Sequence, residues 1–334
     1  MMKNLIFFVL SFLSIACTSE QQDKTLTVYV SEDQVFSEPL LKDFEKETGI
    51  KVNAVYDTEE SKSTGVMNRL IAEKNNPQAD VYWANEPIRA EVLRQKNLLT
   101  PYLSPNAKGI PQKFKEKNNY WTGFSARIRV LIAANTLKEK PDSILDYTRS
   151  KYKAKTVIAN PLFGTTTAHV AALFSVWGET KTKHFLEKLK ENQTVLSTSN
   201  GESADFVASK QYAFALVDSD DAISRFRQKQ NISIIYPDQK EGEVGVFVVP
   251  NAVMMIANAP HPKMAQKFID FLLSKESEEK LARADCAQIP LHQGVTAPKG
   301  LKSISTLKVM QVDYASVAQK MVESQKYLKD WVSQ

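Results

Sequence analysis

Residues 26–57 read LTVYVSEDQVFSEPLLKDFEKETGIKVNAVYD, and this stretch decides the fold. Its two ends, 26–31 and 51–57, are rich in β-branched and aromatic residues, whereas the apolar residues between them follow helical spacing. Ser37 is a suitable N-cap and Gly49 a suitable C-terminal stop, so we expect a helix between these two residues. A strand, a helix and a second strand in this order predict a βαβ unit with parallel strands.

The same alternation continues through the rest of the chain. The other predicted strands span residues 79–84, 129–135, 155–161, 214–218, 232–238, 245–251 and 253–258. The other predicted helices span residues 60–75, 88–96, 166–178, 181–191, 262–274, 276–284 and 314–332. This order predicts an α/β fold of mixed, mostly parallel sheets flanked by helices. Two series of strands without a long linker predict two lobes, and a cleft between lobes is a preferred ligand site.

The N-terminus resembles a targeting signal. Residues 1–17 read MMKNLIFFVLSFLSIAC, in which one lysine precedes an apolar run that is too short to span a bilayer. We therefore expect a secretory signal peptide over residues 1–16. A cysteine directly after small residues resembles a bacterial lipoprotein cleavage site, so Cys17 is the expected lipidated residue and 17–25 a tether. This predicts a protein of the periplasm or cell surface that touches the membrane only through its lipid.

Composition and motifs narrow the class of protein. Of the 334 residues, 43% are hydrophobic and 24% charged, which excludes a disordered or disulfide-rich scaffold. The net charge of +5 is too small to indicate a nucleic-acid partner. The motifs GxSxG, HExxH, GxGxxG and paired CxxC are absent, and the four histidines are scattered, so we expect neither an enzyme nor a zinc site of Cys and His ligands. Cys286 has no activating neighbour in the sequence and is expected to be structural.

Acidic residues follow four of the predicted strands, at the strand ends where ligands bind in open α/β sheets. Asp33 and Glu86 follow the first and third strands, and Asp220 and Asp221 follow a strand of the second series. Carboxylates in this arrangement can supply the oxygen ligands of a hard cation. Each residue could instead cap a helix, but one cap needs only one carboxylate, which favours a binding role for the adjacent pair. Asp218 is expected to be the structural residue of that group.

A second group of residues suits an anion. Gly164, Thr165, Thr166 and Thr167 open a predicted helix, where a glycine permits a tight turn and where hydroxyls and backbone N–H groups attract negative charge. Threonines also cap helices without binding a ligand, so a structural role is equally open. Arg127, at the expected start of a strand near a crossing segment, could clamp an anionic group.

Several segments together resemble one known family. The segments are LTVYVSEDQ, FEKETGIKV, ADVYWANEP, WTGFSARIRVLIAAN, ANPLFGTTTAHVAALF, FALVDSDDA and PHPKMAQKFIDFLLSKESEEKLA. Over residues 25–300 they resemble the type-2 periplasmic solute-binding proteins of ABC transporters, especially the ferric-ion-binding group. The resemblance implies a monomeric two-lobed receptor that delivers a small solute or metal ion to an ABC permease. It also implies that residues 26–128 with about 253–300 form one lobe, and that 129–252 with the C-terminal helix at about 301–334 form the other.

The resemblance further implies a role for each acidic residue. In ferric-ion-binding proteins a histidine follows strand one, a glutamate follows strand three, and two adjacent tyrosines bind the metal from the second lobe. Asp33 stands at the histidine position and Glu86 at the glutamate position, and Asp220 and Asp221 stand at the tyrosine pair. The implied ligand is therefore iron(III) or another hard cation.

A companion anion completes the implied site. The loop 164–167, with help from Arg127, matches the small-residue helix start that holds a synergistic anion in the family. Because carboxylates replace both phenolates, which favour iron(III) strongly, an organic ligand is the alternative. A polyamine or an amino-phosphonate would place its ammonium group on the carboxylates, and an acidic group would bind Arg127 and the threonines.

Overall fold

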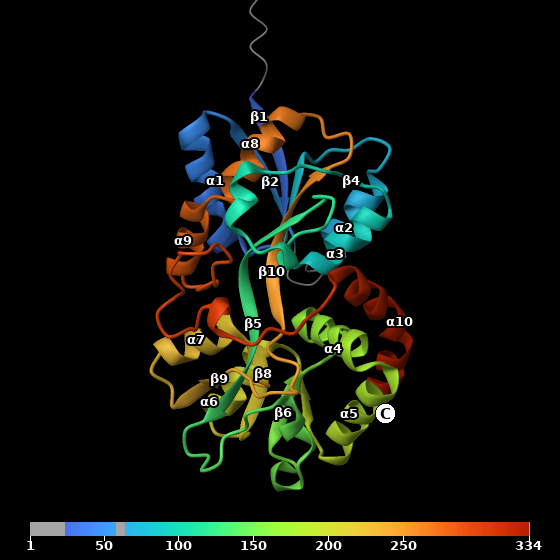
Figure 1. Ribbon diagram of the computed structural model, residues 1–334, viewed down its shortest axis with the longest axis vertical. Helices are drawn as coiled ribbons and strands as arrows, with labels where there is room; N and C mark the ends of the chain where they lie inside the picture. The colour runs from blue at the N-terminus through green and yellow to red at the C-terminus, as the bar shows by residue number, and fades with distance from the viewer. Residues whose placement is uncertain (1–23, 58–63, 334) are drawn as a thin grey trace, which may run out of the picture.

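The computed structural model describes residues 24–57 and 64–333 (Figure 1). The strands in this part of the chain are β1 (Thr25–Val30), β2 (Lys51–Tyr56), β3 (Val81–Ala84), β4 (Leu99–Thr100), β5 (Thr122–Ala134), β6 (Thr156–Ala159), β7 (Val195–Ser197), β8 (Phe214–Asp218), β9 (Ile232–Ile235) and β10 (Val248–Ile256). The helices are α1 (Gln34–Thr48), α2 (Thr64–Ala72), α3 (Pro87–Gln95), α4 (Gly164–Trp177), α5 (Glu179–Glu191), α6 (Asn200–Ala208), α7 (Ser219–Arg227), α8 (Pro262–Leu272), α9 (Lys275–Arg283) and α10 (Tyr314–Ser333). The expected signal peptide, Cys17 and most of the tether lie outside the described residues. Within the described ranges, no helix combines the length and the apolar character that crossing a bilayer requires.

The strand β5 joins the two halves of the molecule. In the upper half of Figure 1 the strand order is β2-β1-β3-β10, with β4 also on β10, and in the lower half the order is β8-β6-β7. Residues 122–128 of β5 pair antiparallel with β10, and residues 129–134 pair antiparallel with β8 and β9. The outer pairs β1–β2, β1–β3, β6–β7 and β6–β8 are parallel. The fold is therefore the expected two-lobed α/β fold with a mixed sheet. The sheet is not mostly parallel as predicted, because β5 and β10 pair antiparallel with all their partners among the described strands.

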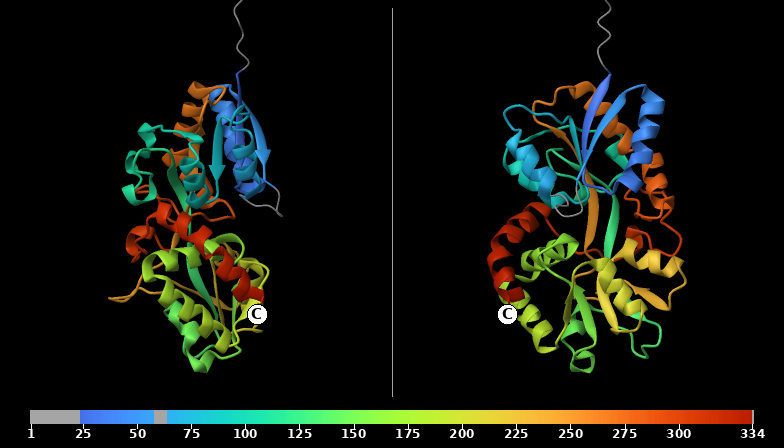
Figure 2. Two further views of the ribbon diagram at one scale, coloured as in Figure 1. Left: turned by 90° about the vertical axis from the view of Figure 1, so that its right-hand side faces the viewer. Right: turned by 180° about the vertical axis from the view of Figure 1, so that it is seen from behind.

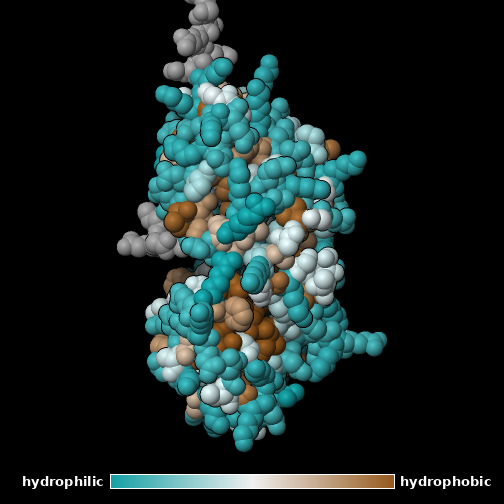
Figure 3. All heavy atoms as spheres, turned by 90° about the vertical axis from the view of Figure 1, so that its left-hand side faces the viewer, coloured by the Kyte–Doolittle hydropathy of each residue, from teal (hydrophilic) through white to brown (hydrophobic). Residues whose placement is uncertain are grey.

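Helices cover both faces of the sheet, so the central strands are buried throughout. Every residue of β3 and of β10 is buried, which is why β3 is apolar throughout and β10 is apolar apart from Asn251, with no alternating pattern. Phe44 of α1 packs edge-on against Phe268 and Phe271 of α8, with ring centroids 5.1 and 5.5 Å apart. This contact joins the first βαβ unit to a segment more than two hundred residues later in the sequence. On the face shown in Figure 3 the surface is mainly hydrophilic, with apolar residues gathered below the waist.

The C-terminal helix α10 contacts both halves of the molecule. It packs chiefly against α4 of the lower half and also against α3 of the upper half (Figure 2). Leu328 and Trp331 of this helix are buried, and the Tyr327 hydroxyl donates to the Glu187 carboxylate of α5 at 3.0 Å. The helix therefore spans the waist on the side opposite α7 and α9 (Figure 1).

Helix α1 begins earlier than the sequence predicts. Its N-cap position is Asp33, and Ser37 lies inside the helix, where its hydroxyl donates back to the Asp33 carbonyl at 3.0 Å. Ser37 is therefore not the cap, and Pro39, which the sequence would place near a first turn, lies within the helix. Gly49 ends the helix as predicted, with the left-handed φ of 68° that glycine adopts readily.

Two predicted strands are one strand, and a third is longer than predicted. Parts of the predicted strands 245–251 and 253–258 form the single strand β10, which continues past Pro250 by a register shift between Pro250 and Asn251. The strand expected at 129–135 begins seven residues earlier, so Arg127 lies within β5 and not at its start. The sequence interpretation also missed β4, β7, α6 and α7, of which β4 and β7 are very short.

The aromatic contact between α1 and α8 gives a test of the fold. Phe44 is fully buried, and Val322 on α10 is an apolar residue that is 65% exposed. We expect Phe44→Ala to lower the free energy of unfolding by about 3–5 kcal/mol because it opens a cavity. Val322→Ala, the control, should change it by less than about 0.5 kcal/mol. Urea unfolding measures both, and equal effects would contradict this account of the packing.

Candidate functional site

A cavity of about 860 Å³ lies between the upper and lower halves. Side chains from both halves line it. Those that bear charge are Glu32, Asp33, Glu86 and Arg89 from the upper half, Arg127 from β5, and Asp218, Asp220 and Asp221 from the lower half. The structure thus brings together the predicted residues Asp33, Glu86, Arg127, Asp220 and Asp221, which are far apart in the sequence. Their role in binding stays a prediction, since the cavity shows only that they are neighbours.

Three carboxylates converge on the lower wall. Asp218 ends β8, and Asp220 and Asp221 lie in the first turn of α7; one oxygen from each lies within 4.8 Å of the others. Burial raises the pKa of Asp220 to about 6, with a further rise from the charge of Asp218 and an opposing effect of Arg127. Burial and the charges of Asp220 and Asp218 also raise the pKa of Asp221. Such crowding favours protons or a bound cation at this wall.

Asp218 is held in a buried network with Arg129, which is fully buried. The Arg129 Nη1 donates to Asp218 Oδ1 at 2.9 Å and to Asn200 Oδ1 at 2.9 Å, while the Thr165 hydroxyl donates to Asp218 Oδ2 at 2.7 Å. This agrees with the structural role expected for Asp218. The network also fixes the start of α4 and of α6 against β8, so it positions the lower wall of the cavity.

Asp33 and Glu86, the two acidic residues of the upper wall that the sequence predicted as ligands, both lie at helix starts. Glu86 is the N-cap of α3, and its carboxylate accepts from the backbone N–H of Ile88 at 2.5 Å and from Arg89 Nη1 at 2.8 Å. Glu86 therefore has the capping role that the sequence left open, and a cation would have to share its oxygens. Asp33 lies at the N-cap position of α1, where no side-chain capping bond forms, and it borders the cavity.

The expected anion loop only partly faces the cavity. Gly164, with φ of 59°, and Thr165 border it at the start of α4. Thr166 and Thr167 are not in its wall: the Thr166 hydroxyl accepts from Arg129 Nη2 at 3.1 Å, and the Thr167 hydroxyl is buried without a partner among the described residues. Thr166 and Thr167 point away from the cavity because successive side chains of a helix point in different directions. Only the start of α4, at Gly164 and Thr165, therefore borders the cleft.

Arg127 borders the cavity between the two acidic walls. Its Nη2 donates to the carbonyl of Asn85. Burial opposes its charge, but the carboxylates of Asp218, Asp220 and Glu32 raise the pKa of the guanidinium above its usual value. Arg127 therefore stays charged, in the position of an anion clamp.

Glu32 and the start of α6 were not predicted as parts of the site. Burial raises the pKa of Glu32 to about 7, and Asp33 and Asp220 add to the rise while Arg127 opposes it. The signal was present in the run Ser31-Glu32-Asp33-Gln34, but the sequence does not show which of two adjacent acids is buried. Asn200 borders the cavity because it opens α6, a helix that the sequence interpretation missed.

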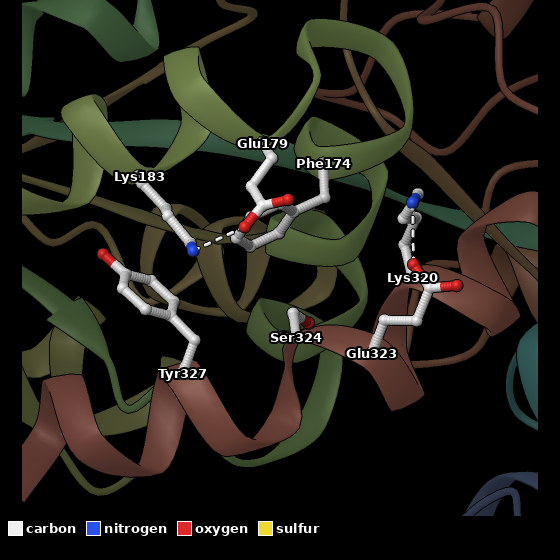
Figure 4. Close-up of a pocket in the computed structure, with 7 residues that line it drawn as sticks. All are labelled: Phe174, Glu179, Lys183, Lys320, Glu323, Ser324 and Tyr327. Carbon is white, nitrogen blue, oxygen red and sulfur yellow. Dashed lines mark hydrogen bonds and ion pairs between the residues drawn. The ribbon is translucent and has the colours of Figure 1, made fainter.

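A smaller cavity of about 110 Å³ lies between α5 and α10 (Figure 4). Its charged side chains pair with each other along their own helices, Lys183 with Glu179 at 2.5 Å and Lys320 with Glu323 at 2.7 Å. The ammonium of Lys183 also lies 4.7 Å from the centroid of the Tyr327 ring. These contacts indicate that the residues around this cavity pack α10 against α5 rather than bind a ligand.

Two lobes around a charged cleft suit a protein that binds a small solute between them. Residues 40–308 match the bacterial extracellular solute-binding protein family, and the chain belongs to this family. Its members serve ABC transport systems and are not enzymes, so this chain is a transport protein that binds a solute outside the cytoplasm.

The names of similar proteins refer to more than one class of solute. "Iron uptake protein A1" of Synechocystis is 27% identical over 86% of this chain and 81% of that protein. A "putative 2-aminoethylphosphonate-binding periplasmic protein" of Salmonella typhimurium is 25% identical over 86% of this chain and 85% of that protein. Among solved structures, the apo ferric ion-binding protein A of Pasteurella haemolytica superposes with a TM-score of 0.82 at 23% identity, over 92% and 98% of the two chains. The last comparison shows the fold alone.

The buried pair Arg129–Asp218 gives a prediction about stability. Asp218→Ala leaves the Arg129 charge buried without its carboxylate partner, so we expect the free energy of unfolding to fall by about 3–5 kcal/mol. The control is Asp205→Ala, which removes an ion pair to Arg225 from a side chain that is 60% exposed and should cost less than about 1 kcal/mol. Chemical denaturation measures both changes, and an Asp218→Ala effect no larger than that of the control would contradict the network's role.

The raised pKa of Asp220 predicts a dependence of stability on pH. Asp220 keeps its proton to about pH 6 in the folded state, whereas the unfolded chain releases it near 3.8, so folding loses stability as the pH rises between these values. We expect Asp220→Asn to reduce the loss of unfolding free energy between pH 4 and pH 7, by on the order of 1–2 kcal/mol. Glu47→Gln, at an exposed position on α1, is the control. Parallel pH slopes for Asp220→Asn and the wild type would refute this reading of the acidic wall.

Proposed function

We propose that this chain is the solute receptor of an ABC importer and that it closes its two lobes on iron(III) held with a companion anion. The observation that carries the proposal is the convergence of the Asp218, Asp220 and Asp221 oxygens within 4.8 Å of one another on the wall of the cavity. Hard cations require several oxygen ligands, and a cation would offset the repulsion among these carboxylates. The names of the iron-binding relatives support the same ligand.

Each wall has a defined part in this proposal. Asp220 and Asp221 bind the metal from the lower lobe, and Asp33 binds it from the upper lobe when the cleft closes. Glu86 contributes less than the others, because its oxygens already accept from the start of α3 and from Arg89. The solute binds the closed arrangement better than the open one, because only closure places ligands from both lobes around it.

The companion anion has a place in the same cavity. Arg127 supplies the charge, and Gly164 and Thr165 supply the start of α4, whose backbone N–H groups point their positive ends toward the cleft. Thr166 acts indirectly through Arg129, and Thr167 has no direct part. The anion neutralises Arg127 and fills coordination positions that the carboxylates leave on the metal.

An organic zwitterion is the alternative solute. A cavity of about 860 Å³ is within the usual range for small organic ligands, and it exceeds what a metal ion needs. The aminoethylphosphonate-binding relative supports a ligand whose ammonium lies on the carboxylates and whose phosphonate lies on Arg127. The two solutes differ in one simple property, since only the metal can be removed by a chelator.

The cellular arrangement follows from the same proposal. Cys17 carries the lipid that anchors the receptor at the outer face of a membrane, and the receptor works as a monomer with its permease. The upper lobe holds residues 26–128 and about 253–300, and the lower lobe holds residues 129–252 with α10. The path of β5 between the two sheets supports this division.

Iron binding is tested on protein that is purified without chelator. We expect iron(III) with phosphate to raise the thermal midpoint of the wild type and elemental analysis to find about one iron per chain. Asp220→Ala combined with Asp221→Ala should abolish both effects, whereas Asp205→Ala, at an exposed site on α6, should not change them. If the double variant retains the shift, the assigned site is wrong. A chelator-insensitive organic ligand in native mass spectrometry would favour the zwitterion instead.

Lipid anchoring is tested separately in cells. We expect the full-length chain to fractionate with membranes and Cys17→Ser to appear in the soluble extracytoplasmic fraction, because one thioether-linked lipid is the proposed anchor. The Cys286→Ser variant, which keeps Cys17, serves as the control and should stay with the membrane. Unchanged membrane association of Cys17→Ser would contradict the anchor without affecting the binding site.

A further inference from the structure

Glu32 is a buried carboxylate at the cavity to which the proposed function assigns no role, although Gln288 lies within hydrogen-bonding reach of its side chain. It lies two residues beyond the end of β1, it is 7% exposed, and it lines the cavity together with Asp33 and Arg127. Its Oε2 atom is buried and has no hydrogen-bond partner within residues 24–57 and 64–333. A buried oxygen without a partner costs free energy, so its retention at a cavity wall points to a ligand that completes it.

Arg127 has an open donor at the same wall. Its Nε atom is buried and finds no acceptor in the described part of the chain, although Nη2 donates to Asn85. The charges of Glu32 and Arg127 attract each other, yet Glu32 Oε2 and Arg127 Nε do not form a hydrogen bond with each other. A buried acceptor and a buried donor of opposite charge therefore border one cavity, and neither one satisfies the other.

The surrounding charges favour a cationic group beside Glu32 and an anionic group beside Arg127. Asp33 and Asp220 repel the charge of Glu32, so a cationic group beside Glu32 would relieve three carboxylates at once. Arg127 stands next to these acids and borders the cavity that Gly164 and Thr165 also border from α4. An anionic group beside Arg127 would therefore lie between a guanidinium and a helix start, where negative charge is favoured.

We infer that Glu32 and Arg127 form a bipolar subsite, in which Glu32 Oε2 contacts the cationic part of the solute and Arg127 Nε contacts its anionic part. This rests on the proposed function and narrows its substrate class. The solute carries both charges in one small unit, as a ferric ion with a bound oxyanion or an aminophosphonate does. A polyamine, which has only positive groups, leaves Arg127 Nε without an acceptor.

Binding measurements on matched variants test the subsite. The probes are iron(III) nitrilotriacetate with and without inorganic phosphate, 2-aminoethylphosphonate, and spermidine as the purely cationic probe. The variants of the full chain are Glu32→Gln, which keeps the shape but removes the charge, Arg127→Met, and the exposed control Glu47→Gln. Circular dichroism and the unfolding midpoint of each ligand-free variant show that it is folded.

The subsite predicts different effects of the Glu32 and Arg127 variants on binding of the probes. Glu32→Gln should weaken binding of the probe that the wild type binds by tenfold or more, with or without phosphate, since it removes a contact to the cation. Arg127→Met should remove the gain in iron affinity that phosphate gives, or weaken aminoethylphosphonate binding by tenfold or more. Glu47→Gln should stay within twofold of the wild type, and spermidine should bind at least tenfold more weakly than the bipolar probes.

The contrary outcomes separate the subsite from the proposed function. A folded Glu32→Gln variant within twofold of the wild type overturns the subsite, while intact wild-type binding leaves the proposed function standing. Spermidine binding as tight as that of the bipolar probes overturns the bipolar class and leaves the receptor in place. A wild type that binds none of the probes overturns the proposed ligand, and the subsite with it.

Discussion

The strand β5 and its antiparallel partner β10 set the constraint on which the rest of the molecule depends, because β5 belongs to the sheets of both lobes. The two strands are irregular at the same level: Ser125 has a left-handed φ of 36°, and the register of β10 shifts at Asn251. Asn251 Nδ2 donates to the Ser125 carbonyl at 2.6 Å, and Trp83 Nε1 donates to Asn251 Oδ1 at 3.1 Å. The Ser125 N–H in turn donates to the buried Glu278 carboxylate at 2.6 Å. These bonds fix the crossing at which the lobes meet.

The position of the charged site follows from that crossing. Arg127 lies two residues beyond Ser125 and borders the cavity, whereas Arg129, two residues further, is buried against Asp218 in the lower lobe. Two arginines of one strand thus have different tasks, since one is exposed to the cavity and the other closes a buried network. The acidic residues gather around Arg127 because strands of both lobes end, and helices of both lobes begin, at the cavity. A chain with a net charge of +5 thereby encloses a cleft in which the charged residues are mostly acidic.

The same arrangement explains why closure can be selective. Each lobe alone presents carboxylates that repel each other, and the helix starts offer donors that need an anion. A solute that carries a cation and an anion resolves both conditions at once when the lobes approach. The C-terminal helix α10 touches both α4 and α3, so movement of the lobes must preserve or rearrange that contact.

The sequence alone determined the fold class, the order of most elements and the strand ends at which the acids lie, because hydrophobic period and capping residues are local signals. It placed Gly49 correctly as a helix end and Asp218 as a structural acid. It could not show that Pro250 lies inside a strand or that the Glu86 carboxylate caps α3. Nor could it show that the Thr166 hydroxyl contacts Arg129 instead of lining the cleft. It also could not distinguish Glu32 from Asp33, which are adjacent in the sequence. Only the tertiary structure decided these points, because burial and hydrogen-bond partners depend on residues that are distant in the chain and meet only where the two lobes cross.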